Sequence, residues 1–191
     1  MTTASKITLV RVVLIPVFMV LLLCSGGNDA LRWAALGVFV VASISDFVDG
    51  YIARHYNQVT DFGKFADPLA DKLLTTVAFI YMMRDGVCSP VVLCIILARE
   101  FAVSGLRMVA AGAKDGKVIA ANMWGKVKTV LQMLSIIFYF FGTALCWNGT
   151  LESITVVVLV SILLCWLVAI VTAVSGIKYL WDNRGFINTA K

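Results

Sequence analysis

The sequence predicts an all-α, polytopic membrane protein with six transmembrane helices, forming a single domain over residues 1–191. Two observations of composition and one of patterning predict this class. The chain is 61% hydrophobic and only 14% charged, whereas a soluble domain averages about 25% charged residues. Its apolar residues fall into runs of about 20, the length that crosses a bilayer core as a helix. Short polar or glycine-bearing breaks separate the runs, so no room remains for a soluble domain.

The first run follows Lys6 and has no convincing small-residue cleavage site, so we expect a permanent span rather than a cleaved signal peptide. The other runs are longer, and each is bounded by polar residues or glycine. The six predicted spans are Ile7 to Leu23, Leu31 to Ala53, Ala66 to Met83, Cys88 to Ala111, Trp124 to Cys146 and Ile154 to Tyr179.

Basic residues predict the orientation, because they collect on the cytoplasmic side of membrane proteins. One side, which holds both termini, carries Lys6, Arg11, Arg54, Lys64, Lys72, Arg99, Arg107, Lys114, Lys117, Lys126, Lys128, Lys178, Arg184 and Lys191. The opposite side carries only Arg32 and Arg84. Both termini are therefore expected in the cytoplasm. The net charge of +5 reflects this arrangement, and we expect no nucleic-acid partner.

The cysteines are odd in number and lack the spacing of metal ligands, so we expect small apolar residues within helices. A disulfide among the three near outer helix ends is the alternative. The five are Cys24, Cys88, Cys94, Cys146 and Cys165.

Four carboxylates gather around one predicted cytoplasmic loop, Tyr56 to Phe62. Asp46 and Asp49 precede it at i,i+3 spacing, and Asp67 and Asp71 follow it at i,i+4 spacing. Each pair therefore shares one helical face. At about 1.5 Å per residue, the two pairs reach matching depths in antiparallel helices.

Four converging carboxylates repel one another unless a cation lies among them. Hard oxygen ligands suit Mg²⁺ or Mn²⁺, and phosphoryl-transfer sites often hold two ions. We therefore expect a site for two divalent ions. Gly50 follows Asp49 and either lets a ligand approach the backbone or lets helices pack closely.

A second polar group, on the fourth and fifth spans, comprises Arg99, Glu100, Arg107 and Lys126. Guanidinium and ammonium groups that face one cavity would bind a phosphate-bearing substrate. Alternatively, Arg107 and Lys126 reach the membrane interface, or Arg99 pairs with a carboxylate.

The carboxylates belong to a longer pattern, D-F-V-D-G-Y-I-A-R, eight residues, then G-K-F-A-D-P-L-A-D. This stretch resembles D-x2-D-G-x2-A-R-x8-G-x3-D-x3-D, the motif of the CDP-alcohol phosphatidyltransferase family. Its eight fixed positions are Asp46, Asp49, Gly50, Ala53, Arg54, Gly63, Asp67 and Asp71.

Other stretches extend the resemblance over most of the chain. Thr8 and Arg11 match the family's N-terminal N-x2-T-x2-R, although Ser5 stands where Asn is common. The stretches R-E-F-A-V-S-G-L-R-M-V-A-A and W-G-K-V-K-T-V-L-Q-M are similar to the branch that uses glycerol 3-phosphate. The sixth span resembles nothing beyond a generic helix.

The resemblance implies the family's six-helix fold, a homodimer and an active site open to the cytoplasm of a bacterial plasma (inner) membrane. It implies transfer of a phosphatidyl group from CDP-diacylglycerol to sn-glycerol 3-phosphate, which gives phosphatidylglycerol phosphate and CMP. By this likeness Asp46, Asp49, Asp67 and Asp71 hold the metals. Likewise Gly50, Ala53 and Arg54 bind the CDP-lipid.

Combined with these roles, the pattern suggests that Asp71, last in the motif, is the catalytic base that takes the acceptor's hydroxyl proton. Arg99, Arg107 and Lys126 would bind the phosphate of glycerol 3-phosphate. Membrane lipids are further expected partners.

Two alternatives stay open. The acceptor could be inositol phosphate, serine or phosphatidylglycerol, or the chain could be a divalent-cation or proton-coupled transporter. Against transport, the acids lie near one face and no inverted repeat is evident.

Overall fold

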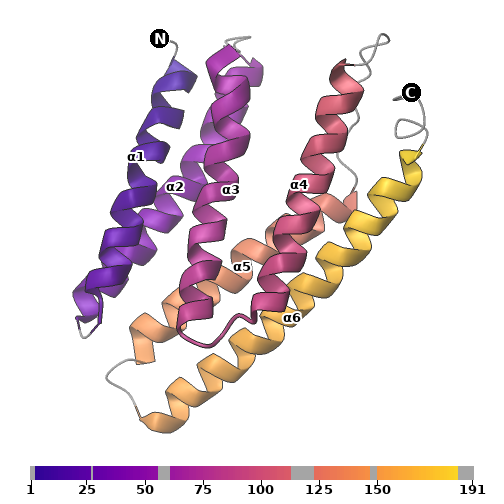
Figure 1. Cartoon of the computed structure of the whole chain (residues 1–191). Helices are drawn as coiled ribbons and strands as arrows, with labels where there is room; N and C mark the ends of the chain where they lie inside the picture. Colours follow the sequence, from indigo (N-terminus) through magenta and orange to yellow (C-terminus); the bar gives the residue numbers. More distant parts are fainter. Residues whose placement is uncertain (1–2, 27, 56–60, 113–122, 147–149, 185–191) are drawn as a thin grey trace. The chain divides into compact units, whose positions relative to one another are not determined.

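Six α-helices and no strands make up the part of the chain that the computed structural model describes, which comprises residues 3–26, 28–55, 61–112, 123–146 and 150–184 (Figure 1). The side chains of residues 3–9, 46–55, 61–71, 109, 111 and 112 also lie outside this description. The helices are α1 (Thr3–Cys24), α2 (Asp29–His55), α3 (Asp61–Arg84), α4 (Pro90–Gly112), α5 (Met123–Cys146) and α6 (Leu151–Asp182).

Each predicted span corresponds to one helix, so the all-α prediction is confirmed. Most helix ends lie one to five residues from the predicted ones, and two of the helix starts differ for a clear physical reason. Helix α3 begins at Asp61 rather than at Ala66, because a polar first turn can be helical although it adds nothing to an apolar run. Helix α4 begins at Pro90 rather than at Cys88, because proline suits the first helical position. The hydroxyl of Ser89 caps this end by accepting a hydrogen bond from the Val91 N–H at 3.3 Å.

The turn between α3 and α4 is tight. Gly86 adopts φ of 76°, a conformation that side chains disfavour. Its N–H donates to the carbonyl of Met83 at 3.0 Å, which satisfies one carbonyl at the end of α3.

Two of the described helices, α5 and α6, are both long and apolar enough to cross a membrane. A shorter apolar stretch, Val10–Cys24, lies within α1. On α6, Leu163, Ile170 and Ile177 are 59–69% exposed, and a face of this kind suits hydrocarbon rather than water. The crossing of a membrane by the other four helices stays a prediction.

The chain divides into two compact units, and each is described by itself. The first unit comprises Met1–Met82 and Ile136–Val157. In it α1 packs against α2, and the ring of Phe18 lies 5.7 Å from those of both Phe39 and Phe140. The hydroxyl of Tyr81 donates to the Met19 carbonyl at 3.0 Å, which ties α3 to α1.

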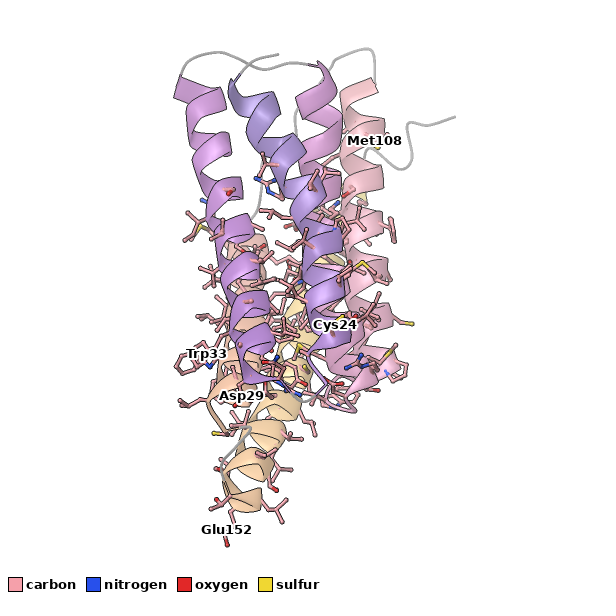
Figure 2. The ribbon with its side chains drawn as sticks, turned by 90° about the vertical axis from the view of Figure 1, so that its left-hand side faces the viewer. Cys24, Asp29, Trp33, Met108 and Glu152 are labelled. Carbon is pink, nitrogen blue, oxygen red and sulfur yellow. The ribbon has the colours of Figure 1, made fainter. Side chains whose placement is uncertain are left out.

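Figure 2 shows Cys24 and Asp29 at the same end of α1 and α2, on either side of the turn that joins them. The carbonyl of Ser25 accepts a hydrogen bond from Asn28, whose side chain in turn caps α2 by accepting from the Ala30 N–H at 3.0 Å. This short turn makes α1 and α2 antiparallel neighbours.

The second unit comprises Met83–Ser135 and Val158–Lys191. Val103 and Leu106 of α4 form a buried cluster with Tyr179 of α6. The ammonium of Lys178 lies 5.8 Å from the ring centroid of Trp124, which is a cation–π contact between α6 and the first turn of α5. Parts of helices α4, α5 and α6 therefore pack together to form this unit.

All five cysteines are free, so the alternative of a disulfide among Cys24, Cys88 and Cys146 is not borne out. Cys88 and Cys165 are buried, as expected of small apolar residues. Cys165 lies within α6 as predicted, whereas Cys88 lies in the turn before α4 rather than within a helix.

Close packing of α5 against α6 in the first unit yields a stability prediction. A β-carbon at Gly142 would lie 2.6 Å from Cγ1 of Val157, and a β-branched side chain has little freedom to move away. We expect Gly142→Ala to cost about 1–3 kcal/mol of stability, measured as a lower Tm in detergent. Gly37→Ala is the control, because a β-carbon there meets nothing within 4 Å. Equal Tm values for both variants would contradict the packing.

Candidate active site

Helices α2 and α3 carry the two carboxylate pairs, and both pairs lie within regular helix. Asp46 and Asp49 are in the second half of α2, and Asp67 and Asp71 are in the first half of α3. Asp49 is six residues from the end of α2, and Asp67 is six from the start of α3. Both therefore lie roughly 9 Å from the loop-facing ends of their helices. Their side chains fall outside the described residues.

The other motif residues predicted to bind the CDP-lipid, Gly50, Ala53 and Arg54, lie on α2. Their side chains are also outside the described residues, and their roles stay predictions.

The donor set of the motif fits a divalent metal ion, because carboxylate oxygens are the ligands that Mg²⁺ and Mn²⁺ prefer. The helical i,i+3 and i,i+4 spacings put each pair on one face. Among the side chains that the structure does describe, which exclude these four, no three His, Cys, Asp or Glu residues gather as a metal site.

Helix α1 brings a buried cation to the level of the first carboxylate. The contact between Phe18 and Phe39 fixes how the antiparallel α1 and α2 are aligned. Arg11 precedes Phe18 by seven residues, and Asp46 follows Phe39 by seven, so the two lie at the same height, each two turns from the ring contact. Arg11 is completely buried. The helix that packs against α2 therefore carries a buried cation at the height of the first carboxylate pair.

The second unit holds a buried charged cluster that we call the α4–α6 charge cluster and define as Arg99, Glu100, Lys128 and Ser175. Both Lys128 and Arg99 donate to the same oxygen, Oε1 of Glu100, the Arg99 bond measuring 3.4 Å. The Arg99 guanidinium also donates to the hydroxyl of Ser175 at 3.3 Å. Helices α4, α5 and α6 therefore each contribute to the cluster.

The balance of charge in this cluster favours anion binding. Two cations share one carboxylate, and the Lys128 and Arg99 side chains are only 4% and 12% exposed. Nε of Arg99 is buried and has no hydrogen-bond partner among the described residues. A buried excess of positive charge that is held by hydrogen bonds suits a phosphate group.

The three basic residues that the sequence predicted to act together have different surroundings in the structure. Arg99 belongs to the charge cluster and does pair with a carboxylate, which was its alternative interpretation. Arg107 is exposed, and its Nε donates to the hydroxyl of Tyr179 at 3.2 Å. Lys126 is exposed near the start of α5.

Lys128 and Ser175 were missed as site residues. A signal for Lys128 exists in the sequence, because Lys128, Gln132 and Ser135 recur at helical spacing. In the structure all three side chains are buried. Such a polar stripe on an apolar helix marks a face that meets other polar groups. Nothing in the sequence distinguishes Ser175 from other serines of α6.

Residues 1–180 match the CDP-alcohol phosphatidyltransferase family, and the chain belongs to this family of membrane enzymes. The family predicted from the motif is thereby confirmed.

Three bacterial proteins are similar to this chain over most of its length. A Bacillus subtilis (strain 168) protein named CDP-diacylglycerol--glycerol-3-phosphate 3-phosphatidyltransferase is 39% identical over 97% of this chain and 97% of its own length. A Rickettsia typhi protein of the same name is 37% identical, covering 92% of this chain and 93% of its own. A Mycobacterium tuberculosis (strain H37Rv) protein named "probable phosphatidylglycerophosphate synthase" is 36% identical, covering 98% of this chain and 86% of its own length.

Proposed function

We propose that this chain transfers the phosphatidyl group of CDP-diacylglycerol to sn-glycerol 3-phosphate, releasing CMP and forming phosphatidylglycerol phosphate. The observation that carries the acceptor assignment is the buried α4–α6 charge cluster, in which Arg99 and Lys128 share Glu100. It suits a phosphorylated acceptor better than serine. The names of the relatives give the same acceptor.

The reaction divides between the two sets of residues. Asp46, Asp49, Asp67 and Asp71 would hold two Mg²⁺ or Mn²⁺ ions, which neutralise charge on the donor's diphosphate when bound. Gly50, Ala53 and Arg54 would bind the CDP-lipid. Arg99 and Lys128 bind the acceptor's phosphate, and the exposed Arg107 and Lys126 attract it electrostatically.

Asp71 acts as the general base. Its carboxylate takes the proton from the primary hydroxyl of glycerol 3-phosphate while that oxygen forms a bond to the phosphorus that bears diacylglycerol. The bond from this phosphorus to CMP breaks, CMP leaves, and the proton passes from Asp71 to water. Binding the acceptor with its hydroxyl close to the donor phosphorus reduces the demand on this weak base.

We further propose that all six helices cross a bacterial plasma (inner) membrane, with both termini and the active site in the cytoplasm, and that the protein works as a homodimer. The bias of basic residues to one side supports this orientation. The apolar, exposed face of α6 supports a lipid environment.

The experiment that tests the proposed function is an acceptor panel with purified protein in detergent. CMP release from CDP-diacylglycerol should require glycerol 3-phosphate and Mg²⁺ or Mn²⁺, and should stop with a chelator. Inositol phosphate, serine and phosphatidylglycerol should give background rates. Preference for another acceptor would overturn the acceptor assignment. No release with any acceptor, from folded protein, would favour the cation-transport alternative.

Lys128 offers a sharper test of the acceptor site. Lys128→Met removes the ammonium but keeps most of the volume, and Glu100 then pairs with Arg99 alone. We expect the KM for glycerol 3-phosphate to rise about tenfold or more. Lys126→Met is the matched variant and should have a smaller effect, because the exposed Lys126 is screened by solvent. Initial rates at varied acceptor concentration measure both, and equal effects would contradict the role of the buried lysine.

A further inference from the structure

Two glycines, one on each neighbouring helix, lie against the Arg99 side chain. A β-carbon built on Gly176 of α6 would lie 2.9 Å from Cγ of Arg99, and one built on Gly125 of α5 would lie 3.2 Å from its Nη2. A real β-carbon almost never approaches another atom as closely as the first distance. Arg99 therefore occupies a slot that requires glycine at position 176 and leaves little space for a side chain at position 125.

The slot constrains both ends of the side chain. Gly176 meets the base of Arg99, where the side chain cannot move without changing its first torsion angles. Gly125 meets the guanidinium tip, which Ser175 and Glu100 also hold. Because Ser175 and Gly176 are adjacent on α6, one turn of this helix supplies both the space and a hydrogen-bond acceptor.

The slot is not a general feature of helix packing in this unit. Gly105, on the same helix as Arg99, would place a β-carbon with nothing within 4 Å. Glycine weakens a helix by about 1 kcal/mol relative to alanine, so helical stability alone does not favour Gly176 or Gly125. Their common property is contact with Arg99.

We propose that Gly176 and Gly125 are positioning residues that hold the Arg99 guanidinium in the orientation that binds the acceptor's phosphate. This inference rests on the proposed function. It adds that acceptor affinity depends on the absence of two side chains on α5 and α6 as well as on the basic residues themselves. A methyl group at position 176 displaces Arg99 and weakens its bonds to Ser175 and to the phosphate.

The test compares Gly176→Ala with Gly105→Ala in initial-rate assays. Gly176→Ala should raise the KM for glycerol 3-phosphate about tenfold, while the KM for CDP-diacylglycerol changes less than about twofold. Gly105→Ala should leave both values unchanged. If Gly176→Ala does not fold, Gly125→Ala replaces it, with a rise of about threefold because the flexible guanidinium tip can shift. A KM for the acceptor that stays unchanged in the folded variant would overturn the proposal.

A double-mutant cycle separates positioning from a general packing defect. In the background of Arg99→Ala, adding Gly176→Ala should not raise the acceptor's KM further, because nothing is left in the slot to displace. Independent, multiplicative effects would contradict the proposal. CMP release by the wild-type protein with glycerol 3-phosphate separates a failure of the proposed function from a failure of the positioning role. If the wild type releases no CMP, the proposed function is refuted. If it does, and the two substitutions raise the KM independently, only the positioning role is refuted.

Discussion

Replacing Asp71 with asparagine should lower kcat for CMP release about a thousandfold, the middle of the roughly 100- to 10,000-fold range for general acid–base catalysis. The amide keeps the size of the side chain and one oxygen, but it cannot accept the hydroxyl proton. It also removes one negative charge from the proposed metal site. Saturating donor, acceptor and divalent metal in the assay separate the loss of the base from weaker binding.

Asp182→Asn is the matched control, because Asp182 is an exposed residue at the end of α6. This variant should retain wild-type kcat. Asp71→Asn protein that remains folded and keeps kcat within about threefold of wild type would exclude Asp71 as the base, since proton transfer contributes at least about a hundredfold in enzymes.

Replacing Arg99 with alanine should raise the KM for glycerol 3-phosphate about 10- to 100-fold, because hydrogen bonds to a charged group contribute about 1.5–3 kcal/mol. The KM for CDP-diacylglycerol should change little. The effect is large because Arg99 is mostly buried and shares Glu100 with Lys128, so its removal also lets Glu100 neutralise Lys128 completely.

The control for this variant is Arg184→Ala. Arg184 is an exposed arginine whose guanidinium lies 4.9 Å from the ring centroid of Trp181, and its removal should leave the acceptor's KM unchanged. Equal rises in the KM values of both substrates for Arg99→Ala would show that Arg99 supports the fold rather than the acceptor.

Most of the helical architecture can be predicted from the sequence because each helix contains a long apolar run. The errors lie at polar ends. The first turn of α3, from Asp61, carries too few apolar residues to be counted as span, although hydrogen bonding of the backbone does not depend on polarity. At α4 the apolar run begins at Cys88, but the helix begins only at Pro90, because Ser89 caps the helix and Pro90 occupies its first position.

The carboxylate motif can be read from the sequence because its residues are close together in the chain, at helical spacing. The α4–α6 charge cluster is assembled from three helices, and its contacts with Lys128 and Ser175 join residues far apart in the chain. Lys128 and Glu100 are both polar residues in apolar segments, but the sequence does not show that they meet. The space that Gly176 leaves for Arg99 becomes visible only when the side chain is placed.

The measurement that tests the central claim most directly is the ratio of CMP released to glycerol 3-phosphate incorporated into lipid. Both products are quantified in the same reaction mixture. Wild-type protein given CDP-diacylglycerol and labelled glycerol 3-phosphate should incorporate one acceptor into lipid for each CMP released. Release of CMP without incorporation of glycerol 3-phosphate would mean that water or another alcohol attacks the donor, and would contradict the account.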